Sequence, residues 1–104
     1  MPGRKVAGNR IELDGRLVGE PEVRITPRGT WVLRFSVDCS TPGEELRLGI
    51  VVTGDMALAA KGLLQPGRLL KVSGRLRALK AGIKTINPDA AFEVIAASVE
   101  GLDS

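Results

Sequence analysis

Apolar residues recur at every second position in several short runs of this chain, and glycine or proline residues separate the runs. In one run, Trp31, Leu33 and Phe35 share a face with Val37 and Cys39. This alternation is typical of β-strands that bury one face. We therefore expect strands at residues 10–18 and 22–25, 31–39, 46–53, 68–79 and 91–99.

One segment between these runs has the spacing of a helix. Its expected apolar face consists of Met56, Ala59, Ala60 and Leu63. Asp55 can cap its N-terminus, and Pro66-Gly67 follows it. The expected order is therefore three strands, a short helix and two strands.

Glycines also suggest irregularities in the first strand. Gly15 lies in the middle of an alternating run and is a candidate for a bulge or bend. The sequence Gly19-Glu20-Pro21 is expected to break the strand before residues 22–25. In the third run, Leu46, Leu48, Ile50 and Val52 are expected to face inward.

This order of elements is that of the OB-fold, an all-β, five-stranded Greek-key barrel with a short helix between strands 3 and 4. With 104 residues, the chain is expected to form one domain over 1–104, with residues 1–8 as a disordered N-terminus. Phe35 and Phe92 are expected in the core. Trp31 is expected in the core or in a dimer contact, with a base-stacking platform as the alternative.

The charges are distributed unevenly along the chain. Residues 1–84 hold all 15 Lys and Arg residues and 8 acidic residues, whereas residues 85–104 hold 4 acidic residues and no base. Between Asp55 and Asp89 there is no carboxylate, and Glu93 lies in the acidic end. A one-sided cationic field indicates a polyanionic partner, with nucleic acid as the first candidate.

Several functional classes are excluded by composition. The chain has no His and one cysteine, Cys39, which argues against classical metal sites and Ser–His or Cys–His catalysis. Glu12 and Asp14 are interpreted as surface charges. We expect no enzymatic activity and no cofactor. The single cysteine suits a reducing cytoplasm, and no apolar run is long enough to predict a membrane span.

Basic residues coincide with the face that OB-folds use for nucleic acid, which consists of the middle strands and the loops joining strands 1–2 and 4–5. Arg24 lies in the expected 1–2 connection. The predicted nucleic-acid-binding residues are Arg28, Arg34, Arg47, Arg75, Arg77, Lys80 and Lys84.

Seven segments resemble the bacterial single-stranded-DNA-binding proteins, and most of all the short primosomal replication protein N type. They are NRIELDG at residues 9–15, PEVRITPRG at 21–29, LRFSV at 33–37, GIVVTG at 49–54, PGR at 66–68, VSGRLR at 72–77 and VEGLDS at 99–104. The resemblance implies binding of single-stranded DNA, contact with a helicase in replication restart, and a homodimer or tetramer. Val32, Val51 and Leu69 are expected to be exposed and to contribute to the subunit contact.

The chain departs from this family at the positions that stack on bases. These positions hold Glu45-Leu46-Arg47, Thr53 and about Ala81, none of them aromatic. Binding is therefore expected to rest on phosphate contacts and to depend steeply on salt. Two alternatives remain: an OB-fold adaptor whose main partner is a protein, and a tail-less single-stranded-DNA-binding paralogue.

Overall fold

The computed structural model describes residues 8–79 and 92–102. It confirms the expected order of elements. They are β1 (Ile11–Ile25), β2 (Trp31–Asp38), β3 (Arg47–Thr53), α1 (Asp55–Lys61), β4 (Leu69–Ala78) and β5 (Phe92–Gly101). Residues 1–8 were expected to form a disordered N-terminus, and residues 1–7 of this segment lie outside the described part of the chain.

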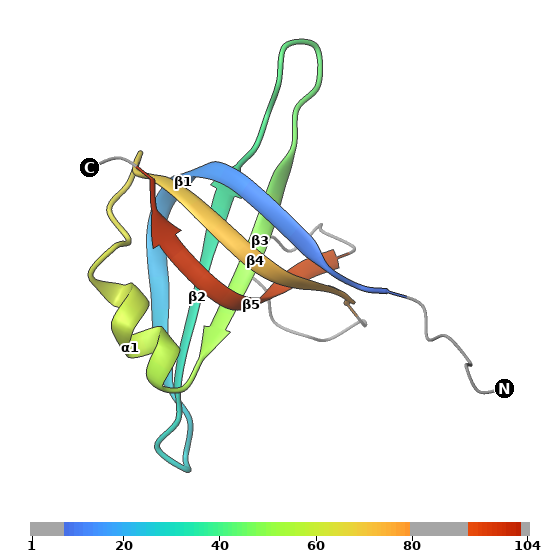
Figure 1. Ribbon diagram of the computed structural model, residues 1–104. Helices are drawn as coiled ribbons and strands as arrows, with labels where there is room; N and C mark the ends of the chain where they lie inside the picture. The colour runs from blue at the N-terminus through green and yellow to red at the C-terminus, as the bar shows by residue number, and fades with distance from the viewer. Residues whose placement is uncertain (1–7, 80–91, 103–104) are drawn as a thin grey trace, which may run out of the picture.

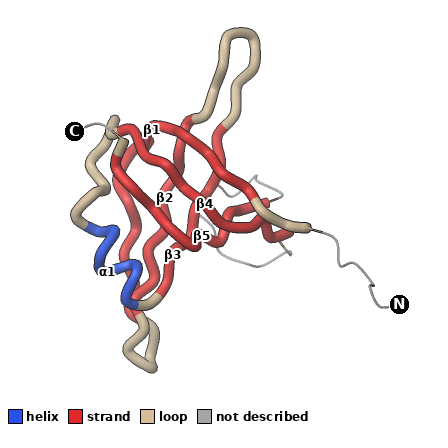
Figure 2. Tube along the Cα trace, in the orientation of Figure 1, coloured by secondary structure: helices blue, strands red, loops and turns tan. Residues whose placement is uncertain are grey.

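The five strands form a closed barrel in the order β1-β2-β3-β5-β4, which confirms the all-β barrel consistent with an OB-fold (Figure 1). All neighbouring strands are antiparallel except β3 and β5, which are parallel. The helix α1 lies beside the barrel, between β3 and β4 in the chain, and packs against β2, β3 and β5 (Figure 2). No helix among residues 8–79 and 92–102 is long and apolar enough to cross a membrane.

The interior contains the apolar face that the alternation predicts. Leu33, Phe35 and Val37 of β2 are almost fully buried, and Trp31 is half-buried and packs against the same core. The other strands contribute Leu17, Ile50, Val52, Leu70, Val72 and Val94. Such alternation places polar side chains on the outside of the barrel, where a ligand can reach them.

Phe92 and Leu46 depart from the expected core. Phe92 is the first residue of β5 and is 52% exposed, because it lies at the end of the barrel, where it pairs with Ala78. Leu46 precedes β3 and is 41% exposed. The alternation of apolar residues therefore predicted the correct face of the sheet for these two residues, but it did not predict where the core ends.

The first strand is longer and more continuous than predicted. Gly19-Glu20-Pro21 does not break β1, which runs through this segment with a register shift between Val18 and Glu22. The expectation of a bulge at Gly15 is also wrong. Gly15 lies where β1 approaches the end of β2, and a Cβ there would be 2.8 Å from Cys39 Sγ. Two other glycines lie at register shifts: Gly19, with a φ of 70°, lies within the shift of β1 against β2, and Gly74 lies at the shift of β4 against β5.

The helix begins differently from the prediction. Asp55 is its first residue, the N-cap is Gly54 with a φ of 73°, and no side chain caps the helix. Ala57, Ala60 and Leu64 are buried, whereas the predicted Ala59 is exposed. The apolar face is therefore rotated relative to the predicted one.

A side chain extends the pairing of β1 with β4 beyond the start of β1. The Asn9 side-chain nitrogen donates to the carbonyl oxygen of Leu76 at 2.9 Å. The backbone N–H of Leu76 donates to Asn9 Oδ1, also at 2.9 Å. The backbone pairing of β1 with β4 ends at Ile11 and Gly74. The Asn9 side chain therefore supplies the hydrogen bonds that a further backbone pair would supply.

Candidate nucleic-acid interface

A groove on the outside of the barrel collects four arginines, and we call it the arginine groove. It is lined by Arg24, Thr26, Val32, Arg34, Val51, Thr53, Arg75, Arg77 and Ile95. No acidic residue of the described part of the chain lines it. A hollow of this composition suits an anionic ligand.

Strand register explains why residues distant in sequence meet in this groove. Arg34 of β2 pairs with Val51 of β3, Val51 pairs with Ile95 of β5, and Ile95 pairs with Arg75 of β4. Paired residues of neighbouring strands point to the same face of the sheet. The row therefore has an aliphatic middle, Val51 and Ile95, with an arginine at each end.

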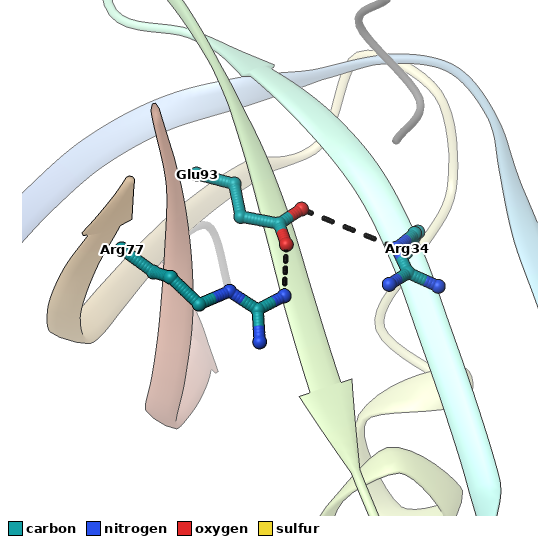
Figure 3. Close-up of polar contacts among 3 residues, drawn as sticks. All are labelled: Arg34, Arg77 and Glu93. Carbon is teal, nitrogen blue, oxygen red and sulfur yellow. Dashed lines mark hydrogen bonds and ion pairs between the residues drawn. The ribbon is translucent and has the colours of Figure 1, made fainter. Parts of the chain in front are cut away.

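The next row of the sheet contains a buried acid. Glu93 of β5 pairs with Gly49 of β3 on one side and with Arg77 of β4 on the other. Its side chain is 1% exposed. Arg77 Nη2 donates a hydrogen bond to Glu93 Oε1, and Arg34 Nε lies 4.0 Å from Glu93 Oε2 (Figure 3). We call Arg34, Arg77 and Glu93 the Glu93 cluster.

The two arginines lie beside different oxygens of this carboxylate, Arg77 beside Oε1 and Arg34 beside Oε2 (Figure 3). The Arg34 side chain is 15% exposed, and that of Arg77 is 38% exposed. A buried carboxylate requires a paired cation, because the charge has lost its hydration. Three buried atoms of the cluster have no hydrogen-bond partner within the described residues: Arg34 Nε, Arg77 Nε and Glu93 Oε2.

Val51 is not the exposed subunit-contact residue that the sequence suggested. It is 3% exposed, because Arg34 and Ile95 lie beside it on the outer face of the sheet. Val32 and Leu69 are half-buried. The outward-facing apolar residues of β2 and β3 thus form part of the floor of the arginine groove.

A comparison with known families supports the wider family of the sequence resemblance and does not test the primosomal replication protein N type. The model of the single-strand binding protein family matches residues 8–102, nearly the whole chain. The chain belongs to the single-strand binding protein family. Membership indicates single-stranded DNA as a ligand; proteins of this family bind DNA and are not enzymes. A search of curated proteins found no match.

Within this family member, the predicted binding residues do not all lie together. Arg34, Arg75 and Arg77 line the arginine groove together, and Arg24 joins them from the end of β1. Arg28 lies in the turn after β1 and does not line the groove. Lys80 and Lys84 lie outside the described residues.

Arg47 lies on the outer face of β3 but at the end opposite to Thr53, and it does not line the groove. Its Nε lies 3.9 Å from Asp38 Oδ2 in an exposed ion pair. The pKa of Asp38 is lowered from its ordinary value, chiefly by hydrogen bonds from Ser40 and to a smaller extent by Arg47. Arg47 is therefore paired with a carboxylate at the edge of the barrel.

The sequence did not predict Glu93 as part of the site. It falls in the acidic C-terminal stretch and has no basic neighbour in the chain. Its two partners lie 16 and 59 positions earlier in the sequence, and only the parallel pairing of β5 with β3 brings Arg34 near. The alternation of β5 predicts that Glu93 faces outward, but it does not predict what covers the side chain.

Proposed function

We propose that the chain binds single-stranded DNA in the arginine groove through its phosphates. The proposal is carried by the row in which Arg34 and Arg75 enclose the aliphatic pair Val51 and Ile95. Guanidinium groups suit phosphate oxygens because they donate several hydrogen bonds in one plane. The aliphatic middle of the row suits the sugar and base faces of the strand.

Within the groove, Arg24 and Arg75 are proposed as the principal phosphate contacts. Both are exposed, and neither forms an ion pair with a carboxylate in the described ranges. Lys80 and Lys84 are proposed to add further contacts. The stacking positions in the described residues, Glu45-Leu46-Arg47 and Thr53, carry no aromatic ring. Binding is therefore expected to tolerate different bases and to weaken steeply with salt.

Fluorescence anisotropy of a labelled oligothymidine over a series of salt concentrations tests this proposal. The variant Arg24→Ala/Arg75→Ala should lower the slope of log affinity against log salt by about 1.4, because each lost phosphate contact contributes about 0.7. Arg16→Ala/Lys71→Ala is the matched control, since it removes two cations that do not line the groove. Equal effects of the two variants would refute the assignment of this face.

The finer role that we propose is that of the primosomal replication protein N type: presenting single-stranded DNA to a replication-restart helicase. The segments quoted above support it. Capture of such a helicase by the chain after nuclease treatment, together with measurable affinity for oligonucleotides, is the expected result. Helicase capture with no affinity for DNA would instead support the protein-adaptor alternative.

We further propose that the chain forms a homodimer. Val23 and Ile25, in the second half of β1, are 42% and 54% exposed. Among the described strands, this half of β1 pairs with β2 alone, because its pairing with β4 ends at Arg16. An exposed apolar strand with an unpaired edge favours association. Light scattering at micromolar concentration should give a dimer mass, and Ile25→Glu should give a monomer.

A further inference from the structure

The geometry points to Glu93 as a positioning residue that limits both the affinity and the salt dependence of DNA binding. This inference rests on the proposed function, because it concerns how the arginine groove presents its charges. Glu93 lies beneath the groove and contacts two of its four arginines. The Glu93 cluster therefore has a net charge of +1, whereas the sequence suggests a charge of +2 from its two arginines.

Burial makes this neutralisation permanent in the folded chain. The Glu93 side chain is 1% exposed, and neither water nor salt can replace its partners easily. By contrast, Glu12 is 64% exposed beside Lys71, at a distance of 3.8 Å. Mobile ions screen a pair of that kind. The position of Glu93 therefore determines its effect on a bound phosphate.

The contacts also restrict the arginine side chains. Arg77 is held by a hydrogen bond to Oε1, and Arg34 is drawn toward Oε2, the other oxygen of the carboxylate (Figure 3). A phosphate that approaches either guanidinium must share it with Glu93, whose negative charge repels the phosphate. Arg24 and Arg75, by contrast, form no ion pair with a carboxylate of residues 8–79 and 92–102.

The decisive variant is Glu93→Gln, which keeps the size of the side chain and removes its charge. We expect the slope of log affinity against log salt to become steeper by about 0.7, as one more phosphate contact forms. If the two salt curves converge near 1 M, that change corresponds to about eightfold tighter binding at 50 mM salt. A slope and affinity equal to or below the wild-type values, in a folded Glu93→Gln protein, would overturn the inference.

Glu12→Gln is the matched control. It makes the same substitution and the same change in net charge at an exposed residue outside the groove. Its salt slope should equal that of the wild type. If Glu12→Gln reproduced the effect of Glu93→Gln, overall charge would explain both results, and the specific role of Glu93 would be refuted.

A second variant addresses the case in which Glu93→Gln does not fold. Arg77→Gln/Glu93→Gln removes a cation and its anion together, and leaves Arg34 to supply the single charge of the cluster. We expect its affinity to stay within about twofold of the wild type, because the net number of neutralised phosphates is unchanged. A slope lower by about 0.7 would show that Arg77 contacts phosphate independently of Glu93, and would overturn the inference.

These outcomes are separate from failure of the proposed function. If wild-type protein did not bind oligothymidine, the proposed function itself would fail. If wild-type protein bound and Arg24→Ala/Arg75→Ala weakened binding while Glu93→Gln had no effect, only the role assigned to Glu93 would fail.

Discussion

Glu93 and Glu12 are the same residue type, and each lies within 4.0 Å of a cation, yet their surroundings differ. Glu93 is enclosed by two arginines beneath the arginine groove, whereas Glu12 is exposed beside Lys71 on the outside of β1 and β4. A buried charge that loses its partner cannot recover hydration, but an exposed one can. The comparison therefore separates an ion pair that the fold depends on from a pair that it tolerates losing.

The largest effect is expected from Arg77→Ala. This change leaves Glu93 with Arg34 alone, at 4.0 Å and without a hydrogen bond. We expect a loss of roughly 3 kcal/mol in the free energy of unfolding, near the lower end of the range for a broken buried pair because one cation remains. Urea denaturation measures it. A loss below about 1 kcal/mol, which is typical of surface pairs, would remove the distinction between the two regions.

Lys71→Ala should have a much smaller effect. Its partner Glu12 remains exposed and hydrated, so the expected loss is below about 0.5 kcal/mol. The same urea titration, repeated in 1 M salt, should give a still smaller difference between variant and wild type, because salt screens exposed pairs. A loss as large as that of Arg77→Ala would show that burial does not govern these pairs.

The smallest effect concerns the exposed pair of Asp38 and Arg47. The pKa of Asp38 is depressed, so its stabilising contribution is present above the ordinary value of 3.8 and is lost as the pH falls through the lower folded value. Carboxyl chemical shifts should therefore titrate below pH 3.8. Ser40→Ala should raise this midpoint more than Arg47→Ala does, because the Ser40 side-chain hydrogen bond is the largest cause of the shift.

Periodicity predicted most of the fold because each buried position depends on its own strand. The alternation of β2 placed Leu33, Phe35 and Val37 inward, and all three are buried. It failed where a neighbouring element decides the outcome. Phe92 has the correct parity but lies at the end of the barrel, and Gly15 is required by the approach of Cys39.

The candidate site was predicted less completely than the fold. Charge and strand order predicted Arg34, Arg75 and Arg77, which line one groove. Arg47 followed the same rule, yet it pairs with Asp38 at the far end of β3. Glu93 could not be found, because its environment depends on the register between β5 and two other strands. The alternation along a strand predicts on which face of the sheet a side chain lies, whereas the register between strands determines which side chains are its neighbours.

The side-chain amide of Asn9 has a consequence for how long the end of the β1–β4 pairing stays intact. This one side chain supplies both a donor and an acceptor to the backbone of Leu76. Spontaneous deamidation would convert the donor into a second acceptor, facing the carbonyl oxygen of Leu76, which can only accept. The junction between the first and fourth strands would then lose one of the two hydrogen bonds at its end through chemical ageing alone, without any change in the gene.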